Sequence, residues 1–235
     1  MGLYILGINI GSYWSMLILA TIVCIWLSIK RAKSFEIKTY IAVIITVLLI
    51  LYGCVGAKLL YIIENPNDFS IASGMSFYGS VFFVPIGIAV TALITRVRIS
   101  RCMDFIAVYI PLILAFMRIG CFSQGCCGGI VCTIGDTQFI PPVQLIECFL
   151  DILIFILLFV TEKKHKIIAA GEQYPKFMIS YAVIRFILEF FRDTEKNILG
   201  MSSGQWFSIV SFIIGISIII LLRRLVKRKL RATNS

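Results

Sequence analysis

Seven apolar segments dominate this sequence and constrain its fold more than any other feature. A helix needs roughly 20 apolar residues to cross the hydrocarbon core of a bilayer. We expect membrane spans over residues 11–29, 39–63, 77–95, 103–122, 142–161, 177–191 and 205–222. Because 60% of the 235 residues are hydrophobic, a water-soluble domain of this length could not bury its apolar surface. The sequence therefore predicts an all-α integral membrane protein, a single domain over residues 1–235 with about seven transmembrane helices.

The basic residues indicate how this bundle is oriented. Most of the 22 Lys and Arg residues follow the first, third, fifth and seventh segments, and the last group is the run RRLVKRKLR at Arg223–Arg231. Cytoplasmic loops of membrane proteins are enriched in Lys and Arg. We therefore expect a retained first helix, an N-terminus outside and a C-terminus in the cytoplasm. The net charge of +10 reads as a topology signal, and no soluble basic domain remains to bind nucleic acid.

Two arginines lie within the predicted spans and do not belong to the topology signal. At 1.5 Å per residue, Arg118 lies about 22 Å along its helix and Arg185 about 13 Å along the sixth. An arginine at the bilayer centre costs at least roughly 2.5–3.5 kcal/mol, so such residues are as a rule paired or functional. Arg185 and Glu189 could neutralise each other as a structural pair, which would not explain why Arg118 and Arg192 are present. Several arginines facing one cavity would suit the phosphate of an anionic phospholipid.

The spacing of the sixth segment groups its polar residues. Tyr181, Arg185, Glu189 and Arg192 follow one another at intervals of four, four and three, which predicts a single helical face. This segment is short and charged, so hydropathy alone would miss it. Lys58, near the outer end of the second span, can instead extend its amine towards the membrane surface.

Glycines mark the end of the fourth segment, in the stretch FMRIGCFSQGCCGG (Phe116–Gly129). We expect Gly120 and the glycines after it to end the helix in irregular backbone. Such backbone at membrane depth is tolerated where it lines a cavity or is buried in protein. Arg118 and the glycines therefore point to one cavity.

At this stretch the chain resembles the prolipoprotein diacylglyceryl transferases, whose signature is GRxGNFxNxExxG. Further blocks resemble that family in the same order along the chain: GSYWSML (11–17), SGMSFYGSVFF (73–83), PPVQLIE (141–147), YAVIRFILEFFRD (181–193) and SSGQWFS (202–208). The resemblance implies a seven-span bacterial cell-membrane enzyme. It would move a diacylglyceryl group from phosphatidylglycerol, or a related anionic phospholipid, to the lipobox cysteine in the signal peptide of a lipoprotein precursor.

The resemblance also assigns roles by position. It implies catalytic roles for Arg118, Arg185, Tyr78 and Glu189. It implies substrate-binding roles for Tyr13, Lys58, Gly79, Gly120, Gln144, Glu147, Tyr181 and Arg192. Glu147 could equally make a hydrogen bond that only packs helices, and Tyr13 and Tyr181 could be aromatic residues of the membrane interface. We expect no cofactor and no metal ion here.

This chain departs from the family where a base is needed. Tyr78 and Pro141 replace the two family histidines, and Lys58 replaces an arginine. The sole histidine, His165, falls in a cytoplasmic loop. Tyrosine, with a usual pKa of about 10, accepts a thiol proton poorly unless a neighbouring arginine lowers its pKa, so Glu147 and Glu189 are alternatives. The family activity, transfer to another acceptor, and non-enzymatic phospholipid binding all remain open.

The cysteines cluster after the fourth span. Cys121, Cys126, Cys127 and Cys132 have a C-x4-C-C-x4-C spacing that differs from the usual zinc patterns. A disulfide is permitted outside the cytoplasm, one thiol could take part in the chemistry as a transient lipid carrier, and small residues lining a turn are the simplest interpretation of any single one. We therefore predict neither a metal ligand nor a catalytic residue among them.

Overall fold

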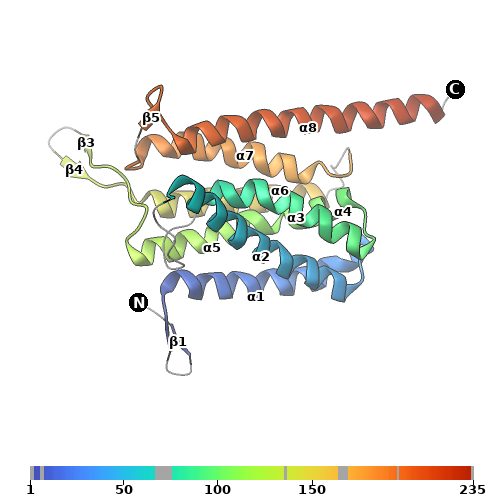
Figure 1. Ribbon diagram of the computed structural model, residues 1–235, viewed down its shortest axis with the longest axis horizontal. Coiled ribbons are helices and arrows are strands. Elements are labelled where there is room, and N and C mark those ends of the chain that lie inside the picture. Colours follow the sequence, from blue (N-terminus) through green and yellow to red (C-terminus); the bar gives the residue numbers. More distant parts are fainter. Residues whose placement is uncertain are drawn as a thin grey trace. The chain divides into compact units, whose positions relative to one another are not determined.

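The computed structural model describes residues 3–5, 8–66, 76–134, 137–163, 169–194 and 196–233. Its elements are mainly helices, with short two-stranded hairpins at one end (Figure 1). In chain order they are β1 (Leu3–Ile5), β2 (Ile8–Ile10), α1 (Ser12–Ala32), the 3-10 helix η1 (Lys33–Phe35), α2 (Thr39–Glu64), α3 (Phe77–Thr95), α4 (Ile99–Ala107), α5 (Tyr109–Gln124), β3 (Cys132–Ile134), β4 (Thr137–Phe139), α6 (Val143–Lys163), α7 (Gln173–Leu188), the 3-10 helix η2 (Glu189–Phe191), β5 (Lys196–Ile198), β6 (Met201–Ser202) and α8 (Ser203–Thr233).

These helices confirm the predicted class of an all-α membrane protein. Within the described ranges, six helical stretches are long and apolar enough to cross a membrane, one of them formed by α4 and α5 together. The remaining predicted span is α7, whose 16 residues include Lys176 and Arg185. Its length and its charged residues agree with the expectation that this segment is short and charged. The orientation of the termini and the single domain remain predictions.

The chain divides into two compact units. The first unit comprises Met1–Val23 with Ala107–Ser235, and the second comprises Cys24–Ile106. The division falls within α1 and at the end of α4.

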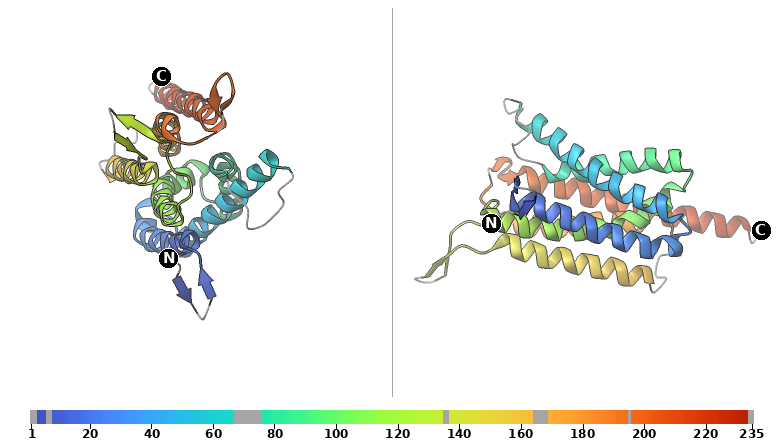
Figure 2. Two further views of the ribbon diagram at one scale, coloured as in Figure 1. Left: turned by 90° about the vertical axis from the view of Figure 1, so that its left-hand side faces the viewer. Right: turned by 90° about the horizontal axis from the view of Figure 1, so that it is seen from below.

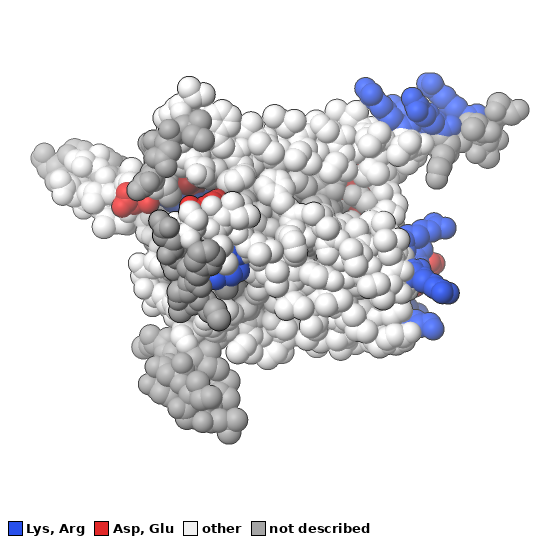
Figure 3. All heavy atoms as spheres, viewed as in Figure 1, with Lys and Arg blue, Asp and Glu red and all other residues white. Residues whose placement is uncertain are grey.

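In the first unit, α5 packs against α6 and α7 packs against α8 (Figures 1 and 2). The contact between α7 and α8 is close, since a Cβ on Gly215 would lie 3.1 Å from the carbonyl oxygen of Pro175. The carboxylate of Glu172, buried at the start of this pair, binds Lys176 and Arg223. The basic side chains of α8 gather at its C-terminal end, whereas the rest of its visible surface is uncharged (Figure 3).

The ending of α5 differs from the prediction. The helix continues through Gly120 to Gln124 and ends where Gly125 adopts the left-handed conformation, with φ of 70°. The expected break at Gly120 is therefore wrong. Gly120 lies inside the helix, and a Cβ there would be 3.0 Å from the Cα of Tyr13. Its small size lets the beginning of α1 approach α5, as small residues do between membrane helices.

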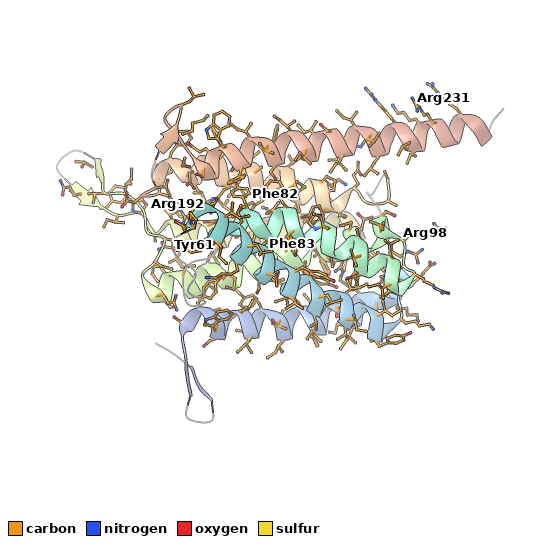
Figure 4. The ribbon with its side chains drawn as sticks, in the orientation of Figure 1. Tyr61, Phe82, Phe83, Arg98, Arg192 and Arg231 are labelled. Carbon is orange, nitrogen blue, oxygen red and sulfur yellow. The ribbon has the colours of Figure 1, made fainter. Side chains whose placement is uncertain are left out.

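In the second unit, α2 and α3 form a closely packed antiparallel pair. A Cβ on Gly56 would lie 2.6 Å from the carbonyl oxygen of Gly79, so both glycines are needed at this crossing. One turn away, the Ser80 hydroxyl donates to the carbonyl oxygen of Gly53 at 2.7 Å. Tyr61 and Arg98 lie at opposite ends of this unit (Figure 4). The end of α2 near Tyr61 and the basic residues that follow α3 therefore lie at opposite ends of the pair.

Candidate functional site

The candidate site is centred on Glu147, a fully buried carboxylate in the second turn of α6. Arg118 of α5 places Nη2 2.7 Å from Glu147 Oε1. Arg192 places Nη1 3.3 Å from Oε2, and Arg185 of α7 places Nη1 3.6 Å from the same oxygen. The Tyr181 hydroxyl donates to Oε1 at 3.0 Å. One carboxylate thus gathers three guanidinium groups and a phenol hydroxyl, which we call the arginine cluster.

A second carboxylate, that of Glu189, binds the arginine cluster through Arg185. Arg185 Nη2 lies 2.8 Å from Glu189 Oε2, and the Ser202 hydroxyl donates to Oε1 at 2.9 Å. Gly204 makes room for this side chain, because a Cβ there would be 2.8 Å from the carboxylate carbon. The Gln205 side chain accepts a hydrogen bond from the Ser202 backbone at 3.1 Å. The beginning of α8 therefore positions Glu189, a role that the sequence analysis did not foresee.

The direction of the helices explains why these residues meet. α5 and α7 end near the cluster while α6 and α8 begin there, because successive spans run in opposite directions. Arg192 lies at the opposite end of the first unit from Arg231 on α8 (Figure 4). The cluster is therefore built from four helix ends at the side of this unit away from the basic tail.

Arg192 does not share a helical face with Tyr181, Arg185 and Glu189, as its spacing predicted. α7 ends at Leu188, the 3-10 helix η2 follows, and Arg192 is extended, with φ of −100° and ψ of 146°. Its backbone pairs instead with Gly129 in an isolated antiparallel bridge. Arg192 nevertheless reaches Glu147, because that bridge fixes its position beyond the helix.

The structure also revises the predicted pairing of the charges. Arg185 and Glu189 do form a pair, as the structural alternative required. Arg118 and Arg192, which that pairing left unexplained, both bind Glu147. Glu147 therefore does more than make a single packing hydrogen bond. Tyr181 is buried and hydrogen-bonded to Glu147, so the interpretation as an interfacial aromatic residue is wrong.

The arginine cluster keeps unused capacity to bind an anion. Its three guanidinium groups form ion pairs with two carboxylates, those of Glu147 and Glu189. Among the described residues, Arg118 Nε is buried without a hydrogen-bond acceptor, and so is Arg185 Nη1, because its 3.6 Å distance to Glu147 Oε2 is too long for a hydrogen bond. A buried donor without a partner costs about 1–3 kcal/mol, so native proteins rarely leave one unsatisfied. A ligand with several acceptor oxygens would satisfy both donors.

Asp151 is a further polar residue of this region that the sequence analysis missed. It lies one turn after Glu147 on α6 and is fully buried. Neither carboxylate oxygen has a hydrogen-bond partner in the described part of the chain, although Arg118 and Arg185 lie within electrostatic reach. An acidic residue four positions after Glu147 in an apolar helix was the available signal.

The segment after α5 covers the same end of the first unit. Gln144 Nε2 donates to the carbonyl oxygen of Cys126 at 2.7 Å, which ties this segment to α6. The Ile130 backbone donates to the carbonyl oxygen of Phe191 at 3.0 Å. The pKa of Cys127 falls to about 5, mainly because Cys121 donates a hydrogen bond to its sulfur and further because Arg192 and Arg118 are close, despite partial desolvation.

Three of the predicted site residues belong to the second unit. Tyr78 is buried and stacks on Phe82 with ring centroids 6.4 Å apart. Gly79 lies at the α2–α3 crossing, and the Lys58 amine lies 5.1 Å from the Tyr61 ring centre.

The remaining predicted site residues lie in the first unit. Arg118, Gln144, Glu147, Tyr181, Arg185, Glu189 and Arg192 form or adjoin the arginine cluster. Tyr13 packs edge-on against Trp14 and borders Gly120. His165 lies outside the described residues.

These features define a multi-pass membrane protein with a charged site buried at one end of its helices. A model of the prolipoprotein diacylglyceryl transferase family matches residues 2–221, and the chain belongs to that family. It is 28% identical over 232 residues to the phosphatidylglycerol–prolipoprotein diacylglyceryl transferase of Clostridium tetani, covering 89% of this chain and 92% of that protein.

Other relatives carry the same name. The second phosphatidylglycerol–prolipoprotein diacylglyceryl transferase of Clostridium perfringens is 28% identical over 239 residues, covering 90% of each chain. The protein of that name from Idiomarina loihiensis is 30% identical over 190 residues, covering 73% of this chain and 71% of its own length. The similarity thus extends over most of the chain.

Proposed function

We propose that this protein transfers the diacylglyceryl group of phosphatidylglycerol to the lipobox cysteine of lipoprotein precursors in the bacterial cytoplasmic membrane. The relatives' names supply the substrates. The single observation that carries the proposal is the arginine cluster with its two unsatisfied donors, Arg118 Nε and Arg185 Nη1. A phosphodiester has two charged acceptor oxygens that a planar guanidinium group can bind bidentately.

The thiol loses its proton, and at the glycerol carbon one bond breaks and one forms. The cysteine sulfur attacks the glycerol carbon that bears the phosphate ester, and a carbon–sulfur thioether forms. The carbon–oxygen bond breaks, and its electron pair leaves with the phosphate of the departing glycerol phosphate. Arg118 and Arg185 would stabilise the charge that grows on this phosphate, which is how buried cations accelerate such a step. Arg192, which shares Glu147 Oε2 with Arg185, would contact the same group.

The thiol proton needs an acceptor, and the family histidines are absent. Both oxygens of Glu147 already accept from guanidinium or hydroxyl groups, which makes it a poor partner for a thiol. Glu189 is likewise engaged by Arg185 and Ser202. Asp151, with no donor among the described residues, is an additional acceptor within the cluster's reach. Tyr78 remains a prediction, and in each case the proton finally leaves with the glycerol phosphate or to solvent.

A reconstituted transfer assay tests this proposal. Purified protein would be incubated with phosphatidylglycerol and a lipobox peptide, and the peptide mass would be measured. We expect a diacylglyceryl mass on the peptide thiol, and we expect Arg118→Ala to reduce its rate by at least 100-fold, since one lost charge-stabilising donor typically costs that much. Arg228→Ala, at the exposed end of α8, removes the same charge and should leave the rate unchanged.

Two outcomes would contradict the proposal. Phospholipid that binds the parent protein without transfer would support the non-enzymatic alternative, in which the arginine cluster serves lipid binding only. Equal rates for the parent and Arg118→Ala would show that the arginine cluster does not hold the reacting phosphate. A peptide in which serine replaces the lipobox cysteine should gain no mass, and transfer to it would indicate a different acceptor.

A further inference from the structure

Three cysteine thiols converge where α5 ends, beside the arginine cluster. The sulfur atoms of Cys121, Cys126 and Cys127 all lie within 4.8 Å of one another. Cys121 is buried in the last turn of α5, and Cys126 and Cys127 follow the helix end and are exposed. All three are free thiols. The group is thus open to solvent on one side and fixed to the helix on the other.

The backbone of this turn holds the three sulfurs together. Gly125 ends α5 in the left-handed conformation, and the Cys126 backbone donates to the carbonyl oxygen of Cys121 at 3.2 Å. Cys127 is itself left-handed, with φ of 59°, which is unfavourable for a residue with a side chain. Gln144 fixes the turn from α6 by its hydrogen bond to the Cys126 carbonyl. A strained residue kept in place by its neighbours is characteristic of functional sites.

The spacing of the sulfurs suits a shared metal ion better than a disulfide between the adjacent pair. Thiolates bound to one Zn²⁺ at about 2.3 Å lie about 3.8 Å from each other. Adjacent Cα atoms are about 3.8 Å apart, which is shorter than the roughly 4.4 Å minimum of ordinary disulfides. A bond between Cys126 and Cys127 would therefore be strained, whereas chelation by all three uses the existing turn.

We propose that Cys121, Cys126 and Cys127 form a binding site for one thiophilic cation of the Zn²⁺ or Cu⁺ type. Thiolate ligands select these soft ions over Mg²⁺ or Ca²⁺. Three thiolates and a divalent ion carry one net negative charge, which the nearby Arg118 and Arg192 offset. Zn²⁺ would complete four-coordination with water on the exposed side. The proposal is independent of the transferase activity, because metal binding at this turn needs no lipid or precursor.

A spectroscopic titration with Cd²⁺ and Zn²⁺ tests the site. Full-length protein in detergent, purified under reducing and anaerobic conditions, would be titrated with Cd²⁺ alone. We expect an ultraviolet thiolate-to-metal charge-transfer band that saturates at one ion per chain and is removed by Zn²⁺. Cys126→Ser and Cys127→Ser should each weaken binding at least 10-fold. Cys54→Ser, which alters a half-buried thiol of α2, should bind as the parent does.

A second measurement uses the parent protein alone, so that it tests the site even if the cysteine variants do not fold. In the parent protein, one equivalent of Zn²⁺ should protect Cys126 and Cys127 from iodoacetamide, and the labelling of Cys54 should not change. The absence of a band at tenfold excess of Cd²⁺, with all three thiols reactive, would overturn the proposal. A disulfide joining Cys121 to Cys126 or Cys127 in cells alkylated before lysis would overturn it as well, since two ligands would then be oxidised.

Discussion

Glu147 is the residue whose loss should disturb the site most, because it is the shared counterion of three arginines. Arg118, Arg185 and Arg192 all contact its carboxylate. Removing one partner of a buried ion pair leaves the other charge buried without compensation, which costs roughly 3–5 kcal/mol. The pairing therefore contributes to the folded state as well as to any ligand site.

We expect Glu147→Gln to lower the free energy of unfolding by about 3 kcal/mol, because the amide keeps the shape but not the charge. Thermal unfolding in detergent, followed by circular dichroism, measures the change. Glu64→Gln, at the exposed end of α2, is the matched control and should unfold with the parent. If the two variants unfold at the same temperature, the arginines do not depend on Glu147.

The sequence could identify the unusual arginines but not their partners. Arg118 and Arg185 stand out because each lies in an apolar helix, and that signal is local. Their meeting with Glu147 joins α5, α6 and α7, and no periodicity specifies which helices pack together. Glu147 was named through the family resemblance and as an alternative base, but not as the partner of the arginines. Asp151 was not predicted as a site residue, because it is a single acidic residue in an apolar helix and belongs to no recognisable motif.

At the scale of elements, the length of the apolar segments predicted the spans well, whereas a glycine led to a wrong prediction of a helix end. The ends of α2, α3 and α6 fall within two residues of the predicted spans. Gly120 was expected to break its helix, yet a glycine inside a membrane helix also serves close packing, and sequence alone does not separate these roles. Arg192 was misplaced because a helical spacing was extended beyond the actual end of α7.

The crossing of α2 and α3 makes this dual role of glycine testable. Gly56→Ala would place a Cβ 2.5 Å from the Phe83 Cβ and 2.6 Å from the Gly79 oxygen, so the two helices must separate. Gly53→Ala, one turn away on the same helix, would meet nothing closer than 3.9 Å.

We expect Gly56→Ala to lower the unfolding temperature by several degrees. Gly53→Ala should be neutral or slightly stabilising, since alanine favours a helix by up to about 1 kcal/mol over glycine. Side-by-side thermal unfolding of the two variants checks this, and a lower midpoint for Gly53→Ala would contradict the packing argument.

At the scale of the whole molecule, the positions of the charges connect orientation to function. The arginine cluster and the basic end of α8 lie at opposite ends of the first unit. If the basic end faces the cytoplasm, as the distribution of Lys and Arg predicts, the arginine cluster belongs to the outer half of the membrane. Its lipid would then come from the outer leaflet, where a secreted precursor also emerges.

Reporter fusions test that orientation directly. We expect green fluorescent protein fused after Ser235 to fluoresce and alkaline phosphatase at the same place to be inactive, because the first folds inside the cell and the second only outside. Phosphatase fused after Asn65, at the end of α2, should be active, since four long apolar spans and the predicted span α7 make five between that point and the C-terminus. Active phosphatase after Ser235 would invert the topology, and the arginine cluster would then face the inner leaflet. A precursor thiol could reach it there only before export, so the same measurement decides the stage at which the proposed transfer takes place.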